Sequence, residues 1–157
     1  MLFGILGSGQ LAWMLSLRAK KSGFKTRVIL TESDVEGCDA LTFESEFLDY
    51  TLWKKTFSIV PVFPPLSAME LLSDKWEQKL LFEKYKIPTA KAKLLEAKEV
   101  PLSTGVAKWS RQGYDGYGNL VIQSLEGESF KEKWKTFSDL AKKQKSRIYL
   151  EELIPFQ

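Results

Sequence analysis

Three glycines fall within six positions of the stretch WSRQGYDGYGN, residues 109–119, which lies between two short apolar runs. Two residues are enough to turn a hairpin, so a loop with Gly113, Gly116 and Gly118 is longer than a hairpin needs. Ordering it costs backbone entropy, which a bound ligand can offset. Its amides suit phosphate oxygens, and Lys108 just before it supplies a point charge that suits phosphates. A hairpin tip without a ligand, beside a solvated lysine, is the alternative.

A second glycine motif, GSGQLA at residues 7–12, follows a short apolar run and precedes a helical pattern. A G-x-G-x-x-A turn between a strand and a helix lets backbone N–H groups approach an anion at the helix N-terminus. Three interpretations remain open from these residues. One is a dinucleotide cofactor, with Glu32 or Asp34 about 20 residues on as the ribose acceptor. The others are a different phosphate ligand and a tight turn without a ligand.

The stretch EELIPF, residues 151–156, places two glutamates between a strand-like run and a proline. The backbone of such a linker can pair with a flat heterocycle such as adenine. An exposed sheet edge without a ligand is the alternative.

Composition excludes several kinds of chemistry. The sequence has no histidine, so Ser-His or Cys-His nucleophile pairs and histidine-based metal sites are ruled out. Cys38 is the single cysteine, so no internal disulfide can form, which fits a cytoplasmic protein. The net charge of +3 is too small to argue for a nucleic-acid partner. No apolar run approaches the ~18 residues of a membrane-spanning helix.

The elements that must position the first glycine motif follow from hydrophobic periodicity. Strand, glycine turn, helix and strand form a βαβ unit, which implies a parallel sheet. Carboxylates after the third strand then lie at the edge where such sheets bind ligands. The expected elements are a strand at 2–6, a helix at 10–21, strands at 26–31 and within 39–46, a helix at 47–56, a strand at 58–63 and an extended, non-helical junction at 64–72.

The rest of the chain has the pattern of a small α+β domain. Ser73 is expected to cap a helix that stops before Pro88. Ser129 and Glu132 match a capping box at the start of a second helix. The expected elements are a helix at 73–85, strands at 91–95, 104–109 and 119–124, a helix at 129–145 and a strand at 147–153.

Taken in this order, the motifs resemble the N5-carboxyaminoimidazole ribonucleotide synthetases, the ATPase component of a purine-pathway carboxylase. The resemblance spans the whole chain, and its most specific parts are the glycine loop and the final hinge. It rests on ILGSGQLAWML at the start, TFESEFLD at 42–49, SDKWEQK at 73–79, KIPTA at 86–90, KWSRQGYDGYGN at 108–119 and LEELIPF at 150–156.

The resemblance implies an α/β chain with part of the ATP-grasp fold. A shortened Rossmann-like, pre-ATP-grasp domain at 1–70 would precede the first part of the ATP-grasp domain at 71–157, and the C-terminal half would be missing. The second part would consist of a helix at 73–86, a lid subdomain at 89–150 and an adenine hinge at 151–156. The implied activity is the ATP-dependent carboxylation of 5-aminoimidazole ribonucleotide by bicarbonate through carboxyphosphate, giving ADP and phosphate.

The resemblance also assigns binding residues, position by position. Ile154 would offer its backbone N–H to adenine. The implied ATP-binding residues are Lys75, Lys108, Gly113, Gly116, Gly118, Glu151, Glu152 and Ile154. The implied residues for the aminoimidazole substrate are Gly9, Gln10, Glu44, Tyr114 and Asp115.

This sequence departs from the family's pattern in several ways. The family's chain is much longer, and its magnesium ligands lie in the part absent here, so ATP and Mg2+ are expected with no metal ligand in this chain. Ala12 and Trp13 replace Gly-Arg, Tyr117 replaces the loop lysine, and one strand–helix unit of the first domain is missing.

These departures leave several hypotheses about function. In one group of hypotheses the chain works with a separately encoded second half, is a fragment of a longer protein, or forms a homodimer. In another it survives as a non-catalytic nucleotide-binding or dimerisation module. A further alternative is an NAD(P)-binding Rossmann protein, which predicts a parallel sheet that continues to the C-terminus.

Overall fold

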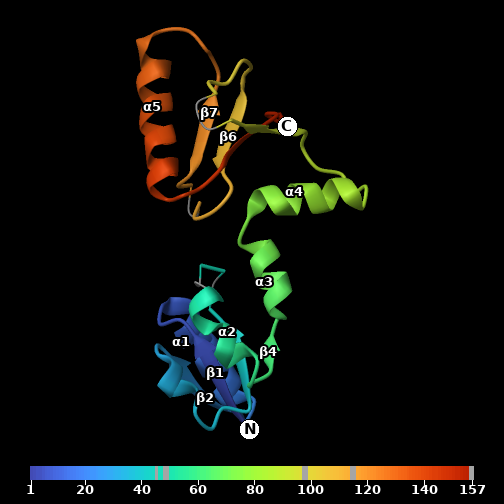
Figure 1. Cartoon of the computed structure of the whole chain (residues 1–157), viewed down its shortest axis with the longest axis vertical. Coiled ribbons are helices and arrows are strands. Elements are labelled where there is room, and N and C mark those ends of the chain that lie inside the picture. The colour runs from blue at the N-terminus through green and yellow to red at the C-terminus, as the bar shows by residue number, and fades with distance from the viewer. Residues whose placement is uncertain (45, 48–49, 97–98, 114–115, 156–157) are drawn as a thin grey trace. The chain divides into compact units, whose positions relative to one another are not determined.

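A computed structural model of the chain describes residues 1–44, 46–47, 50–96, 99–113 and 116–155. The chain divides into two compact units, Met1–Leu72 (unit 1) and Ser73–Gln157 (unit 2), which are described separately (Figure 1). Among the described residues, none of the helices combines the length and the apolar character needed to cross a membrane.

Unit 1 is built on a four-stranded parallel sheet with the order β2-β1-β3-β4. The predicted βαβ unit is confirmed, and its helix has the predicted bounds. The elements are β1 (Leu2–Leu6), α1 (Gln10–Lys21), β2 (Lys25–Ile29), the 3-10 helix η1 (Glu32–Val35), β3 (Ala40–Phe43), α2 (Tyr50–Phe57), β4 (Val62–Phe63) and α3 (Leu66–Leu72).

The core of unit 1 fixes the ends of its strands. Leu6 and Phe43 are buried and pair in register across β1 and β3. Trp53 of α2 and Met69 of α3 pack into the same cluster. Because the two strands are parallel, the glycine turn after β1 and the segment after β3 emerge side by side at one edge of the sheet.

The helix α3 corrects the expectation of an extended junction at 64–72. Proline suits the first turn of a helix, where a backbone N–H has no intrahelical partner. The carbonyl of Pro65 accepts from the amides of Ala68 at 2.9 Å and Met69 at 3.2 Å. The run of prolines therefore precedes a helix instead of preventing one, and the strand before it is only two residues long.

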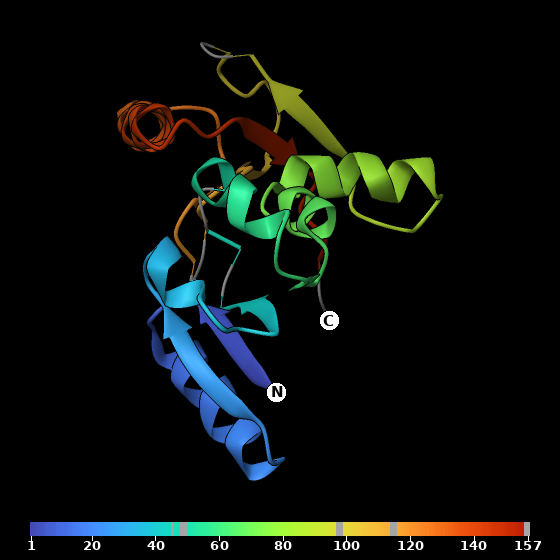
Figure 2. The ribbon, with the colours of Figure 1, turned by 60° about the horizontal axis from the view of Figure 1, so that its bottom comes forward.

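Unit 2 contains an antiparallel sheet with the order β5-β8-β6-β7, so the predicted hairpin is confirmed. One face is covered by α5, which Figure 2 shows end-on beside the strands. Trp134 and Phe137 of α5 pack there against Trp109 and Ile122. The elements are α4 (Lys75–Lys84), β5 (Ala92–Leu95), β6 (Gly105–Trp109), β7 (Asn119–Ile122), α5 (Glu128–Lys143) and β8 (Ile148–Glu151).

Both predicted helix caps in unit 2 are wrong. The N-cap of α4 is Asp74, not Ser73, and its carboxylate accepts from the amides of Trp76 at 3.0 Å and Glu77 at 3.3 Å. The N-cap of α5 is Gly127, which makes no side-chain cap, so the capping box expected from Ser129 does not form.

Candidate functional site

The two faces of the antiparallel sheet differ because side chains alternate along each strand. Ala107 and Trp109 of β6 face the core under α5. Lys108 therefore lies on the opposite face, where it pairs in register with Tyr149 of β8. Glu151, two residues further along β8, shares that face.

Glu151 is a buried carboxylate between two lysines. Its oxygens form ion pairs with Lys79 of α4 and Lys108 of β6. The side chains of Lys79 and Lys108 are 13% and 30% exposed, and that of Glu151 is 9% exposed. Lys79 also donates to the Thr89 hydroxyl at 2.6 Å and the Ala90 carbonyl at 3.0 Å. Lys108 is thus the more accessible of the two cations.

The charges of this cluster affect its neighbours. Burial alone would raise the pKa of Glu151, but hydrogen bonds and charge from Lys108 and Lys79 hold that pKa below its usual value. Burial also raises the pKa of Tyr149, and the charge of Glu151 adds to this. The ring of Trp76 on α4 packs against that of Tyr149, with 5.7 Å between the ring centroids. Glu151 therefore stays ionised although it is buried.

The glycine loop begins at the end of β6 and returns at β7. Lys108 lies opposite Asn119 at its base, and the ammonium of Lys75 donates to the Gly113 carbonyl within it. Gly118 has φ +73°, and a Cβ there would lie 2.9 Å from the ring of Trp109. Gly116 has φ +83° and faces open space. Tyr114 and Asp115 lie outside the described residues, so their predicted roles stay predictions.

The predicted hinge continues the ladder between β5 and β8. Glu152 exchanges backbone and side-chain bonds with Lys91: its amide donates to the Lys91 carbonyl and its carboxylate accepts from the Lys91 amide, both at 2.9 Å. Ile154 is 43% exposed. A hollow of about 270 Å³ is lined by Glu151 and Glu152 together with Lys93, Thr104 and Leu150. The hinge residues are thus next to a hollow in unit 2.

In unit 1 the structure brings Gly9 and Glu44 together. The amide of Gly9 donates to the Glu44 carboxylate at 2.8 Å, and the amide of Glu44 donates to the Leu6 carbonyl at 2.9 Å. A Cβ at Gly7 or Gly9 would collide with the Glu44 carboxylate. Gln10 begins α1 and is exposed beside this turn. The place at the helix N-terminus that favours an anion is taken by the chain's own carboxylate.

The two carboxylates considered as dinucleotide ribose acceptors have protein partners. Asp34 accepts from the amides of Thr31 at 2.8 Å and Leu30 at 3.0 Å, and these backbone bonds lower its pKa. Glu32 accepts from the Thr56 hydroxyl at 3.1 Å. Asp34 thus stabilises the turn after β2, and Glu32 links that turn to α2.

Within the described part of the chain, no group of three or more histidine, cysteine, aspartate or glutamate side chains could hold a metal ion. Asp74 and Glu151, which are buried in unit 2, are bonded to arginines or lysines instead. These residues do not fit a magnesium site.

Sequence reasoning missed two residues of this region, Lys79 and Asp74. Lys79 follows Lys75 by four positions, which places both on one side of α4, so helical spacing could have indicated it. The partners of Asp74 are Arg111 and Arg147, which are distant in sequence. No local pattern marks it beyond its suitability as a helix cap.

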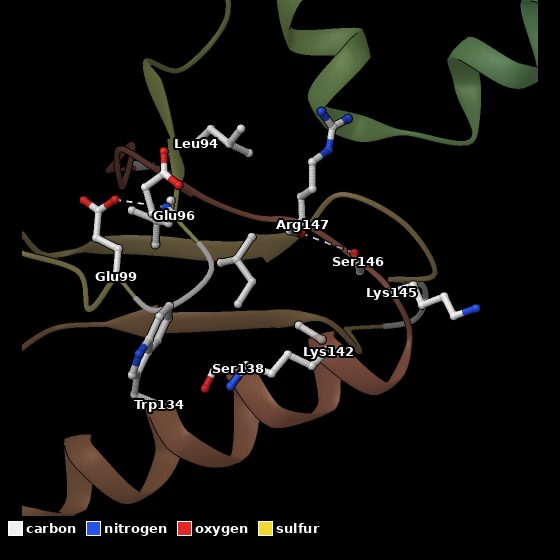
Figure 3. A pocket seen from close by; sticks show the side chains of 12 residues that line it. Leu94, Glu96, Glu99, Trp134, Ser138, Lys142, Lys145, Ser146 and Arg147 are labelled. Carbon is white, nitrogen blue, oxygen red and sulfur yellow. Dashed lines mark hydrogen bonds between the residues drawn. The ribbon is translucent and has the colours of Figure 1, made fainter.

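Another cavity, of about 500 Å³, lies between α5 and the adjoining ends of β5 and β8 (Figure 3). None of the predicted site residues lines it. Its wall is formed by Leu95, Trp134, Ser138, Lys142, Arg147 and Ile148 among others.

No protein-family model matches the chain, but curated proteins do. The N5-carboxyaminoimidazole ribonucleotide synthase of Synechocystis sp. is 33% identical over 148 residues, which cover 77% of this chain and 38% of the relative. The protein of the same name from Synechococcus elongatus is 29% identical over an alignment of 186 residues. This alignment covers 98% of this chain and 45% of the relative. The chain therefore spans less than half the length of these relatives.

Solved structures show the same fold. Carboxyaminoimidazole ribonucleotide synthase from Aspergillus clavatus, complexed with ATP, matches with a TM-score of 0.80 at 22% identity, over 99% of this chain and 48% of that one. N5-carboxyaminoimidazole ribonucleotide synthetase from Thermotoga maritima matches with a TM-score of 0.68 at 26% identity. This match covers 99% of this chain and 47% of that one. The chain is a homologue of the N5-carboxyaminoimidazole ribonucleotide synthases over less than half of their length, with the α/β fold of the matching part of their structures.

Proposed function

We propose that this chain supplies the ATP-binding lid and part of the ribonucleotide site of a cytoplasmic, ADP-forming enzyme that carboxylates 5-aminoimidazole ribonucleotide with bicarbonate. Its homologues carry the name of this activity. Structures similar in fold include one with ATP and one with ADP and the aminoimidazole ribonucleotide.

The observation that carries the proposal is the position of Lys108 at the base of the glycine loop. Its ammonium is partly exposed and is held by Glu151. An ammonium has three donors, so Lys108 can keep this ion pair and still donate to a phosphate oxygen. Loop amides beside a cation form a site for an anion with several oxygens.

These groups suit the chemistry. Bicarbonate is a poor electrophile, and phosphorylation makes it a better one. Phosphoryl transfer depends on positioning and on neutralising charge more than on covalent help from the protein. The proposed ATP residues are Lys75, Lys108, Gly113, Gly116, Gly118, Glu151, Glu152 and Ile154. The proposed residues for the second substrate are Gly9, Gln10, Glu44, Tyr114 and Asp115.

When bound, magnesium would neutralise phosphate charge during the transfer. The described residues offer no cluster for it, so its ligands are assigned to a part of the enzyme outside them, either a second half or a partner chain. We expect the chain alone to turn over slowly or not at all. This expectation keeps a second candidate function open, a nucleotide-binding module without catalysis.

An NAD(P)-binding function has less support. The Glu44 carboxylate stands where a pyrophosphate would approach the turn, and both candidate ribose acceptors are bonded within the protein. The sheet of unit 2 is antiparallel, whereas a dinucleotide-binding fold would continue a parallel sheet.

A thermal-shift titration of the purified chain tests the proposal. ATP with magnesium, and ADP, are each expected to raise the melting temperature. At a ligand concentration of 100 times Kd, the folded state should be stabilised by about 2.7 kcal/mol. Lys108→Ala should abolish this shift. The matched control Lys131→Ala, which removes an exposed lysine from α5 on the other face of the sheet, should retain it. A shift with NADH and none with ATP or ADP would overturn the proposal.

A further inference from the structure

We propose that Asp74 is a positioning residue that holds the start of the glycine loop, residues 110–113, in place for the binding of nucleotide phosphates. The inference rests on the proposed function and concerns a residue outside the ATP and substrate residues named above. Asp74 is 2% exposed and caps α4 through one carboxylate oxygen.

The other carboxylate oxygen of Asp74 is bound to the start of the loop. Oδ2 accepts from Nε of Arg111 at 2.9 Å and from a terminal nitrogen of Arg147 at 2.8 Å. The Ser110 hydroxyl lies 3.5 Å from the same oxygen and is itself buried. Arg147 immediately precedes β8, and Figure 3 shows its side chain pointing away from Trp134 and Ser138 on α5. One carboxylate therefore links a helix start, a loop start and a strand start.

Backbone bonds place the loop in the same position. The amide of Lys75 donates to the Ser110 carbonyl at 2.7 Å, and the amide of Ser110 donates to the Arg147 carbonyl at 2.8 Å. The amide of Arg111 donates to the Ser146 hydroxyl at 3.0 Å. Because Lys75 also holds the Gly113 carbonyl, the first half of the loop is fixed to the start of α4.

The negative charge of Asp74 is needed for this arrangement. Burial opposes it, but hydrogen bonds from Arg147 and Arg111, together with the charge of Arg147, keep the pKa of Asp74 below its usual value. Bonds between ionised groups are about twice as strong as neutral ones. Replacing the carboxylate with an amide would keep the helix cap, since Asn caps as well as Asp, and would weaken the hold on both arginines.

A positioning role predicts an effect on phosphate binding that a purely structural role does not. We would measure the affinities of wild type and Asp74→Asn for ADP and for adenosine, which lacks the groups that the loop would bind. ADP affinity is expected to fall tenfold or more, while adenosine affinity stays within about twofold. The matched control Glu77→Gln removes the other partner of Arg147 on the same helix, and its ADP affinity should remain near that of wild type.

The inference is overturned if the ADP affinity is unchanged in Asp74→Asn, or if the ADP and adenosine affinities are reduced alike. Either would leave the proposed function standing, provided that wild type binds ADP. A wild-type chain that binds neither ligand would overturn the inference and count against the proposed function as well. If Asp74→Asn does not fold, Arg111→Ala removes only the partly exposed loop partner. It is expected to show the same selective loss of ADP affinity, and an unchanged affinity would overturn the inference.

Discussion

The chain has two glycine-rich turns, and the charges around them are opposite. In unit 1 the turn at residues 7–9 is closed by the Glu44 carboxylate, which accepts from the Gly9 amide. In unit 2 the loop after β6 is flanked by Lys108, and Lys75 bonds to it. A glycine pattern frees backbone amides for an acceptor, but the neighbouring side chains decide which acceptor it is.

The position of the carboxylates explains this difference. Glu44 follows β3 and its carboxylate reaches the turn, whereas Glu151 and Asp74 are buried and hold lysines and arginines. The first arrangement satisfies the amides internally. The second keeps cations in place beside the backbone of the glycine loop, as an anion site requires.

Removal of Glu151 should disrupt the arrangement in unit 2, and its effect on stability should be the largest of those considered. Glu151→Ala leaves Lys79 and Lys108 without their shared counter-charge, so the free energy of unfolding of unit 2 should fall by about 3 kcal/mol. Hydrogen exchange of the β6 and β8 amides measures this locally. The control Glu152→Ala loses one exposed bond to the Lys91 amide and should cost about 1 kcal/mol or less. Similar losses in both variants would contradict a buried ion cluster.

The same residue gives a pH dependence. Because the pKa of Glu151 is lowered in the folded state, its stabilising effect is present above its ordinary value of 4.5 and is lost as the pH falls through the folded value. Glu151→Gln cannot titrate. The difference in exchange protection between wild type and Glu151→Gln should therefore be largest near neutral pH and shrink in acid. A difference that grows in acid would mean that the carboxyl is not held ionised.

Alanine substitutions of glycine should separate the two turns at intermediate cost. Gly118→Ala meets the Trp109 ring at a φ of +73°, so strain and the ring contact should together cost about 2 kcal/mol. Gly9→Ala meets only the end of the Glu44 side chain, which can move away. The lost hydrogen bond and the poorer N-cap of α1 should together cost about 1 kcal/mol. Hydrogen exchange of the backbone amides in each unit measures these two losses of stability. A larger loss for Gly9→Ala than for Gly118→Ala would contradict the comparison.

The sequence predicted the elements that repeat a local period but not the contacts between them. The bounds of α1 match those expected because apolar spacing and Gly23 define a helix and its end. The sequence does not separate Ser73 from Asp74 as the cap of α4, because Ser and Asp cap equally well. Arg111 and Arg147, which lie 37 and 73 positions from Asp74, bind its carboxylate.

The same holds for the candidate site: some of its residues follow from local motifs, but the contacts between them do not. Motifs located Lys108 and Glu151, but their ion pair depends on the register of β6 and β8, which no single segment contains. The part played by Lys79 depends in addition on how α4 packs against that sheet. The roles of these residues toward ATP stay predictions.

The smallest expected effect tests the first turn directly. Glu44→Ala removes the internal acceptor of the Gly9 amide at a partly exposed site, at a cost of about 0.5 kcal/mol. The freed amides at the start of α1 should then bind an anion, since a helix N-terminus attracts negative charge. Inorganic pyrophosphate is therefore expected to raise the melting temperature of Glu44→Ala more than that of wild type. Glu36→Ala, with the same change of charge outside the turn, should respond like wild type. An equal response of all three proteins would show that the Glu44 carboxylate does not exclude anions, and the contrast between the two turns would then need another cause.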